Sequence, residues 1–446
     1  MRHLDPARLA SAAVRQRQNT AAAVTGLKAL VSETPAGEVE RHVEEHILIT
    51  GGAGFIGTHL CAALLRRGAR VTAVDSLVAG RLAALDGLQQ HHRFMLIEHD
   101  ITEPLDWTEP VTGVMHLASP IGPAHVRNHP VRTLLAGSNG TINALEIARR
   151  YRARIVLASS AEVYGDPAVQ PQSESYWGNV DPTGAMSGYA EAKRFLEAMA
   201  AAYRREYSVN TGIIRPFNVY GPGMLPGDRR VVAAFVEAAL AGDELVVQGD
   251  GVRSLCYVDD FVTGLIAMLD SDAPGPINLG AADGTSIADL AELVVHTVGS
   301  GNVTRVAAQH AEGTTRCPDI TMAGTVLGWA PVTSLPDGIR ATVKAMRNPE
   351  PPAARATVDF DIPTAWLALI SGSPQLRCQA ATVGGALKWL TDTHPVLAPR
   401  LLSPGYELVP WTNIFLGDTN VRDLDGLDTP LTDAITLTVL PAMAGG

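Results

Sequence analysis

A tyrosine and a lysine that could carry out proton transfer stand four residues apart, as Tyr189-x-x-x-Lys193. On a helix this spacing puts both side chains on one face, where the phenol and the ammonium can act as a unit. A nearby cation favours the phenolate, so we expect the pKa of Tyr189 to lie below its usual value of about 10. Tyr189 is then a candidate base for removing a hydroxyl proton during hydride transfer, and Ser160 could hydrogen-bond the same hydroxyl. A Tyr-x-x-x-Lys pair by itself is more often a chance surface pair, so its interpretation depends on what precedes it.

A glycine-rich turn precedes this pair. Gly51, Gly54 and Gly57 follow a short apolar run at residues 46–50 and open a helix-like stretch. Glycines at this spacing let the backbone turn tightly and bring N–H groups against a pyrophosphate at the positive end of the helix. Asp75 ends the next apolar run and could accept hydrogen bonds from the adenosine ribose hydroxyls, which favours NAD over NADP. The alternative is a structural glycine turn beside a surface aspartate.

The elements that must position these groups alternate between strand-like and helix-like segments, the first helix-like stretch being residues 57–67. Such alternation predicts an α/β fold, a Rossmann-type doubly wound parallel sheet with a small substrate-binding subdomain. The expected strands are residues 46–50, 71–75, 94–97, 113–117 and 155–158.

Residues that follow the third and fourth strands complete the expected cofactor site, because ligands of such sheets bind at the carboxyl ends of the strands. Asp100 and Ile101 are assigned to the adenine, and residues 117–119 to the nicotinamide. An ordinary strand-to-loop transition stays open as the alternative for both. The expected NAD contacts are Gly51, Gly54, Phe55, Ile56, Gly57, Asp75, Asp100, Ile101, Leu117, Ala118, Ser119, Tyr189 and Lys193.

Composition excludes several classes of function. A net charge of −11 argues against nucleic acid as a partner, and no apolar run approaches the roughly 18 residues of a membrane helix. The four cysteines form no Cys-x-x-Cys pair, so we expect buried thiols rather than a disulfide framework or a metal site. The N-terminus has no stretch of signal-peptide type, which predicts a cytoplasmic location.

At 446 residues the chain exceeds what one hydrophobic core normally organises, so two or more domains are expected. Strand-like alternation at 357–362 and 435–440 around a helical segment at 383–393 predicts a small α+β domain at the end of the chain. The N-terminal extension is rich in Ala, Leu and Arg, and is either a docking or oligomerisation element or a tail without chemistry. The expected divisions are a helical extension (1–44), an NAD-binding part with its substrate subdomain (45–346), a Pro-rich linker (347–356) and the terminal domain (357–446).

From His46 to Met346 the sequence resembles an extended short-chain dehydrogenase/reductase. Within that superfamily, residues 158–167, 176–180 and 317–320 resemble UDP-glucuronic acid decarboxylases, also called UDP-xylose synthases. The resemblance implies that the sugar of UDP-glucuronate is oxidised at C4 by NAD, that the β-keto acid loses carbon dioxide, and that the 4-keto pentose is reduced again by the same nicotinamide. It also implies a homodimer formed through the helices that carry Tyr189 and its neighbours.

The same resemblance implies roles for individual residues. Tyr189 is the base, Lys193 its partner and a ribose contact, and Ser160 the residue that orients the hydroxyl. Glu162 is the carboxylate of the decarboxylase motif, and Arg253 matches a catalytic arginine. For the UDP-sugar substrate, the implied contacts are Asn218 at the diphosphate and Arg230, Tyr257 and Arg316 at the UDP moiety, where the planar donor fork of arginine suits phosphate.

Three positions depart from the decarboxylase pattern. Ala161 stands where decarboxylases usually carry serine, Gly223 replaces the arginine of a Gly-Pro-Arg-Met motif, and Met186 replaces an arginine shortly before the tyrosine. Each missing group could recognise a polar or anionic sugar substituent, so these losses concern the substrate more than the redox step. A dehydratase would prefer aspartate at 161, and epimerases commonly lack Glu162.

The end of the chain, an apolar strand running into Gly445 and Gly446, resembles the β-grasp sulfur carriers, which are relatives of ubiquitin and include the small subunit of molybdopterin synthase. A tail without side chains can thread a narrow channel and present its carboxylate for attack on ATP. The resemblance implies adenylation of Gly446 by a ubiquitin-activating-like adenylyltransferase and sulfurtransferase, with conversion to a thiocarboxylate. The alternative is a domain retained only for packing.

Three interpretations follow. The first is a decarboxylase fused to a carrier. The second is a nucleotide-sugar epimerase or dehydratase of a thio-sugar or antibiotic pathway. The third is a sulfur carrier or ubiquitin-like modifier attached to a degenerate dehydrogenase scaffold. We favour the first, in which tethering would hold a keto sugar near an activated sulfur at mM effective concentration.

Overall fold

The computed structural model describes residues 44–120, 123–184, 187–224, 227–249, 251–307, 315–348, 355–370, 376–403 and 406–441. The expected extension 1–44, apart from Glu44, lies outside the described residues. So do most of the linker 347–356, Met186 and Gly446.

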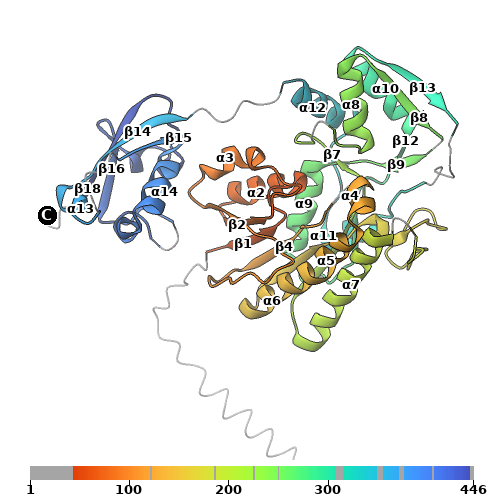
Figure 1. Cartoon of the computed structure of the whole chain (residues 1–446), viewed down its shortest axis with the longest axis horizontal. Helices are drawn as coiled ribbons and strands as arrows, with labels where there is room; N and C mark the ends of the chain where they lie inside the picture. Colours follow the sequence, from red (N-terminus) through yellow and green to blue (C-terminus); the bar gives the residue numbers. More distant parts are fainter. Residues whose placement is uncertain are drawn as a thin grey trace, which may run out of the picture. The chain divides into compact units, whose positions relative to one another are not determined.

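Seven parallel strands form the main sheet, in the order β11-β6-β5-β4-β1-β2-β3 (Figure 1). The order reverses between β1 and β4, which opens a crevice at the carboxyl ends of these two strands. All five strands expected from the sequence are present, so the Rossmann-type prediction is confirmed, whereas β6 and β11 were not anticipated. The strands are β1 (His46–Thr50), β2 (Arg70–Asp75), β3 (Phe94–Glu98), β4 (Gly113–His116), β5 (Arg154–Ala158), β6 (Thr211–Pro216) and β11 (Ile277–Leu279).

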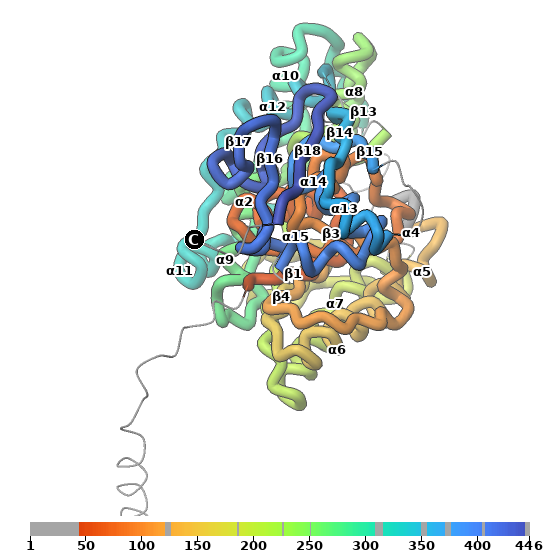
Figure 2. Tube along the Cα trace, turned by 90° about the vertical axis from the view of Figure 1, so that its left-hand side faces the viewer, coloured from red at the N-terminus to blue at the C-terminus, as the bar shows by residue number. Residues whose placement is uncertain are grey.

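Helices cover both faces of this sheet. On one face α6 (Thr141–Tyr151) and α7 (Ser187–Tyr207) lie side by side and bury side chains such as Leu145 and Leu196 against β4 and β5 (Figure 2). On the other face α2 (Phe55–Arg66) and α9 (Val258–Leu269) bury their own apolar stripes. Short helices α3 (Asp86–Gln89), α4 (Pro123–Asn128) and α5 (Pro130–Leu135) lie in the connections.

A smaller subdomain follows β6 and has its own apolar core. Its helices α8 and α10 pack together over the parallel pair β8 and β13. The elements are β7 (Val219–Tyr220), α8 (Val231–Ala241), β8 (Glu244–Gln248), β9 (Val252–Ser254), β10 (Cys256–Tyr257), β12 (Gly284–Ser286), α10 (Ile287–Val298), β13 (Asn302–Val306) and α12 (Leu335–Arg347). The intervening α11 (Thr321–Leu327) packs instead against α9 and β11 of the main sheet.

A separate five-stranded sheet, in the order β15-β14-β18-β16-β17, forms near the end of the chain. Its central strands β14 and β18 are parallel and the other pairs are antiparallel. The two strands and the helix expected there are present, the helix with the same bounds. The elements are β14 (Ala356–Asp361), α13 (Thr364–Leu367), β15 (Arg377–Ala380), α14 (Val383–Thr393), α15 (Ala398–Leu401), β16 (Thr412–Leu416), β17 (Thr419–Asn420) and β18 (Ile435–Pro441).

No helix in the described part of the chain combines the length and the apolarity that crossing a membrane requires.

Candidate active site

The glycine turn joins β1 to α2 and is closed to larger residues. A Cβ at Gly57 would lie 2.1 Å from the carbonyl oxygen of Gly51, and Gly51 itself has a φ of +75°. Gly54 is the N-cap of α2 and offers no side chain to the first-turn amides. The helix begins at Phe55, two residues earlier than expected. Because no side chain caps its first turn, the backbone N–H groups of that turn are suited to bind a pyrophosphate. The cradle that these glycines leave fits a dinucleotide.

Asp75 ends β2 beside this turn. Its Oδ2 accepts the backbone N–H of Ala53 at 3.0 Å, and its Oδ1 accepts that of Leu77 at 2.9 Å. A carboxylate has about four acceptor sites, so lone pairs remain for ribose hydroxyls. The two backbone bonds fix the carboxylate against the glycine turn.

A cavity of about 1210 Å³ opens at this edge of the sheet. It exceeds the roughly 300–1,000 Å³ of an ordinary small-molecule site, which suits a dinucleotide. Arg81 and Lys344, which no sequence motif marks, add cations to its lining. The expected residues that line it are Gly51, Gly54, Phe55, Ile56, Gly57, Asp75, Asp100, Ile101, Leu117, Ala118, Ser119 and Arg230.

Tyr189 and Lys193 lie on α7, next to the end of β5. The Tyr189 hydroxyl is hydrogen-bonded to the side chain of Ser160. The Lys193 Nζ donates to the carbonyl of Ala158 at 2.8 Å and lies 5.6 Å from the centre of the Tyr189 ring. The helix and the strand thus bring the three expected catalytic groups together.

The expectation that Tyr189 has a lowered pKa is wrong for the free protein. Burial raises the pKa of Tyr189 to about 12, and the nearby Glu162 carboxylate adds to this, while the Ser160 hydrogen bond opposes it. Burial also lowers the pKa of Lys193 to about 8. Removal from water therefore outweighs the lowering effects of the Ser160 hydrogen bond and of the Arg230 charge, and the tyrosine is protonated at neutral pH.

Glu162 and Arg316 form an ion pair, although they are 154 positions apart. Ser160 caps the short helical turn that carries Glu162, since its Oγ accepts the Glu162 N–H at 3.2 Å. Arg253 on β9 forms a backbone bridge with Arg316. The structure thus pairs Arg316 with the carboxylate of the decarboxylase motif and places the backbone of Arg253 beside that of Arg316.

The other expected substrate residues, Asn218, Arg230 and Tyr257, contact neighbouring parts of the chain. Asn218 has a φ of +33°, and its Nδ2 donates to the carbonyl of Ser254 at 2.9 Å. Arg230 is paired with Asp228 and lies over the Phe55 ring at 5.0 Å, at the cavity. Tyr257 packs edge-on against a neighbouring tyrosine at 5.9 Å. Only Arg230 of these three lines the cofactor cavity.

The sequence profile described as "NAD dependent epimerase/dehydratase family" matches residues 47–280. The chain belongs to the NAD dependent epimerase/dehydratase family. NAD is its cofactor, and the glycine cradle and Asp75 are the features of this epimerase/dehydratase that fit it.

Among curated proteins, the chain is similar to UDP-glucuronic acid decarboxylases. UDP-glucuronic acid decarboxylase 1 of Xenopus tropicalis is 42% identical over 307 residues, which are 68% of this chain and 72% of that protein. UDP-glucuronic acid decarboxylase 6 of Arabidopsis thaliana is 43% identical over 297 residues, 66% of this chain and 86% of that protein. This epimerase/dehydratase is therefore a decarboxylase-like enzyme.

Solved structures agree on the fold. UDP-glucose 4-epimerase from Thermotoga maritima, with UDP-glucose, has a TM-score of 0.61 and 28% identity, covering 68% of this chain and 99% of that one. UDP-glucuronic acid 4-epimerase from Bacillus cereus, in complex with NAD, has a TM-score of 0.59 and 26% identity, covering 68% and 96%.

Two of the three departures from the decarboxylase pattern are described. Ala161 lies part-buried between Ser160 and Glu162. Gly223 lines the cavity with a φ of +88°, a conformation that side-chain-bearing residues rarely adopt. Near it His59, which sequence reasoning missed, contacts the Pro222 carbonyl through Nε2 at 2.8 Å. The backbone of this epimerase/dehydratase is thus shaped for glycine at 223.

Replacing Asp75 tests the ribose contact. We expect Asp75→Ala to raise the Kd for NAD by about 10- to 100-fold, because hydrogen bonds to a charged group are each worth about 1.5–3 kcal/mol. Calorimetric titration measures this. Asp181→Ala is the control, since Asp181 also accepts an N–H from two residues onward but lies in an exposed loop away from the cavity. Equal affinities in the two variants would contradict the assignment.

The pH profile tests Lys193. With a pKa of about 8, its charge fades as pH rises through that value, and with it the stabilisation of the Tyr189 phenolate. We expect kcat/KM at saturating NAD to fall on the alkaline side of about pH 8. In Lys193→Arg the cation persists, so the decline should move to higher pH. An identical alkaline limb in both proteins would assign it to another group.

Proposed function

We propose that the chain converts UDP-glucuronate to UDP-xylose. The single observation that carries the proposal is that the Tyr189–Ser160 hydrogen bond lies next to the Glu162–Arg316 ion pair, since Ser160 and Glu162 are two residues apart. The decarboxylases that it resembles support the same substrate. The glycine turn and Asp75 would hold NAD, which would supply reversible hydride acceptance for the oxidation and re-reduction at C4.

The chain's own residues do the rest. With NAD and substrate bound, Tyr189 acts as the phenolate after releasing its own proton to solvent. It then accepts the proton of the C4 hydroxyl that Ser160 orients, and Lys193 keeps a positive charge near the phenolate. Oxidation at C4 makes the C5 carboxylate that of a β-keto acid. Loss of carbon dioxide leaves an enolate that takes a proton at C5 from water, and Tyr189 returns its proton to the C4 oxygen when the ketone is reduced again. Glu162 and Arg253 act at the decarboxylation step, Asn218 contacts the diphosphate, and Arg230, Tyr257 and Arg316 hold the UDP moiety.

The test is incubation of the purified protein with NAD and UDP-glucuronate, with UDP-sugars and carbon dioxide followed by mass spectrometry. We expect UDP-xylose and carbon dioxide in equal amounts. Turnover of another UDP-sugar in place of UDP-glucuronate would favour the epimerase or dehydratase alternative, since Ala161 and Gly223 depart from the decarboxylase pattern.

A homodimer through α5 and α7 is part of the proposal. Both helices carry exposed apolar side chains, among them Val131, 68% exposed, and Phe195, 38% exposed. A second copy of the chain would cover them. Light scattering should give the mass of two chains, and Val131→Glu should shift it towards one.

We infer that residues 357–446 are a β-grasp sulfur-carrier domain, joined by the linker 347–356 to the enzyme at 45–346. The strand order with parallel central strands β14 and β18, and α14 packed beside β15, support the fold.

All four cysteines are free, which is consistent with the proposed cytoplasmic location.

The carrier proposal is tested on the tail. Incubation with a ubiquitin-activating-like adenylyltransferase, ATP and a sulfur donor should add the mass that replaces one oxygen of Gly446 by sulfur. An unchanged mass with several such enzymes would favour a domain kept for packing.

A further inference from the structure

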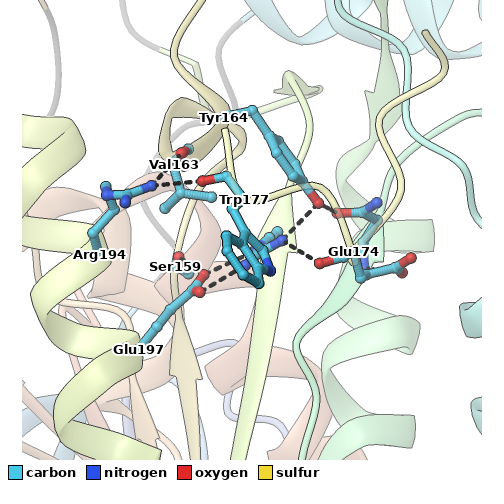
Figure 3. Close-up of polar contacts among 9 residues, drawn as sticks. Ser159, Val163, Tyr164, Glu174, Trp177, Arg194 and Glu197 are labelled. Atoms are coloured by element: carbon cyan, nitrogen blue, oxygen red, sulfur yellow. Dashed lines mark hydrogen bonds and ion pairs between the residues drawn. The ribbon is translucent and has the colours of Figure 1, made fainter. Parts of the chain in front are cut away.

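A buried polar network lies behind the reacting groups. Glu197 follows Tyr189 and Lys193 on α7 at spacings of four residues, so the three side chains share one face. Its Oε1 accepts the Ser159 hydroxyl at 2.6 Å and the Arg215 Nε at 2.8 Å, and its Oε2 accepts the Arg215 Nη2 at 2.7 Å (Figure 3). One carboxylate therefore ties α7 to the residue next to Ser160 and to β6.

The network continues from Arg215 into the segments around the ion pair. Arg215 Nη1 donates to the Tyr164 hydroxyl at 2.8 Å, two residues from Glu162. The Tyr164 hydroxyl, labelled in Figure 3, in turn donates to the Oδ1 of Asn278. That bond is 2.7 Å long. Asn278 Nδ2 donates to the carbonyl of Asp319 at 3.2 Å, three residues beyond Arg316. Both partners of the Glu162–Arg316 pair thus lie close to this network in sequence.

The burial of the charged pair argues against a role in stability alone. The Arg215 side chain is 9% exposed and that of Glu197 is 16% exposed. Burial by itself would lower the pKa of Arg215, but the Glu197 carboxylate outweighs it and holds that pKa above its usual value. A buried ion pair contributes little net free energy of folding, because desolvation offsets the attraction. What the pair does supply is fixed, bidentate geometry.

We propose that Glu197 is a positioning residue, which fixes the rotation of α7 relative to Ser159 and Tyr164 so that Tyr189 and Ser160 meet the same substrate hydroxyl. The inference rests on the proposed function. An error of about 1 Å in such a placement can cost on the order of 100-fold in rate.

Ser159→Ala is the first test, because it removes one donor to Glu197 and leaves the Glu197–Arg215 pair intact. We expect kcat to fall about 10-fold, the rate equivalent of one lost hydrogen bond, with an unchanged KM for the UDP-sugar. Amide hydrogen exchange of residues 188–193, measured with NAD bound, should become faster. Glu197→Gln should lower kcat further.

Tyr203→Phe is the matched control. It also deletes a hydroxyl that donates to a carboxylate, Glu146 at 2.8 Å, and it lies on the same helix, farther from the reacting groups. The control should keep its kcat and its exchange at 188–193. A Ser159→Ala enzyme with unchanged kcat and exchange, or a control that changes equally, would overturn the positioning role. If the unmodified enzyme turns over no UDP-glucuronate, the proposed function fails instead, and the exchange comparison still decides the role of Glu197.

Discussion

Tyr189→Phe will bind NAD as the unmodified enzyme does and will lower kcat by about 10²–10⁴-fold, the usual contribution of a general base. The expected size follows from the geometry, since only the hydroxyl bonded to Ser160 is removed and the part-buried ring stays in place. Tyr189, although an expected NAD contact, is not among the residues that line the cavity, so the substitution leaves that lining unchanged. The measurement is steady-state turnover of UDP-glucuronate together with a calorimetric Kd for NAD.

Tyr151→Phe is the control for this substitution. The Tyr151 hydroxyl donates to the Trp107 carbonyl at 3.0 Å, on α6 and away from the cavity, so its loss should leave kcat unchanged. A Tyr189→Phe enzyme with more than about a tenth of normal kcat would show that another group takes the proton.

Glu162→Gln separates oxidation from decarboxylation. We expect the absorbance of reduced nicotinamide still to appear, because Tyr189, Ser160 and Lys193 are unchanged, while release of carbon dioxide falls by about 10²-fold, as for loss of a charged group from a reacting centre. Stopped-flow absorbance and trapping of carbon dioxide measure the two steps in one preparation.

Glu191→Gln is the matched control, since Glu191 pairs with Arg194 on the surface of α7 at 3.7 Å and is similarly exposed. Both steps should be normal in that variant. If oxidation and carbon dioxide release fall in parallel in Glu162→Gln, Glu162 serves substrate binding or hydride transfer rather than the loss of the carboxylate.

Local sequence patterns were enough to predict most strands of the main sheet and the residues expected at the cofactor site. The glycines at 51, 54 and 57 and Asp75 are set by the turn between a strand and a helix, so their positions follow from neighbouring residues alone. Tyr189 and Lys193 need only helical spacing to share a face. For the same reason the helix at 383–393 could be predicted from its own periodicity.

Long-range packing decided what the sequence left open. The raised pKa of Tyr189 depends on burial that no local pattern reports. The contact of Glu162 with Arg316 joins residues 154 positions apart. Glu197 has no local pattern that distinguishes it from other charged residues of a helix, because its partner Arg215 comes from β6. The signal that could have found it is a carboxylate one turn beyond the Tyr-x-x-x-Lys pair.

The last strand of the chain has a mechanical consequence. Because β18 lies between β14 and β16 in the five-stranded sheet, it is hydrogen-bonded along both of its edges. A force directed along the axis of β18 slides it past the parallel strand β14. The hydrogen bonds between the two strands are then loaded in shear and must break together rather than one after another. The described end of β18 at Pro441 is therefore held in the sheet against a force directed along the strand.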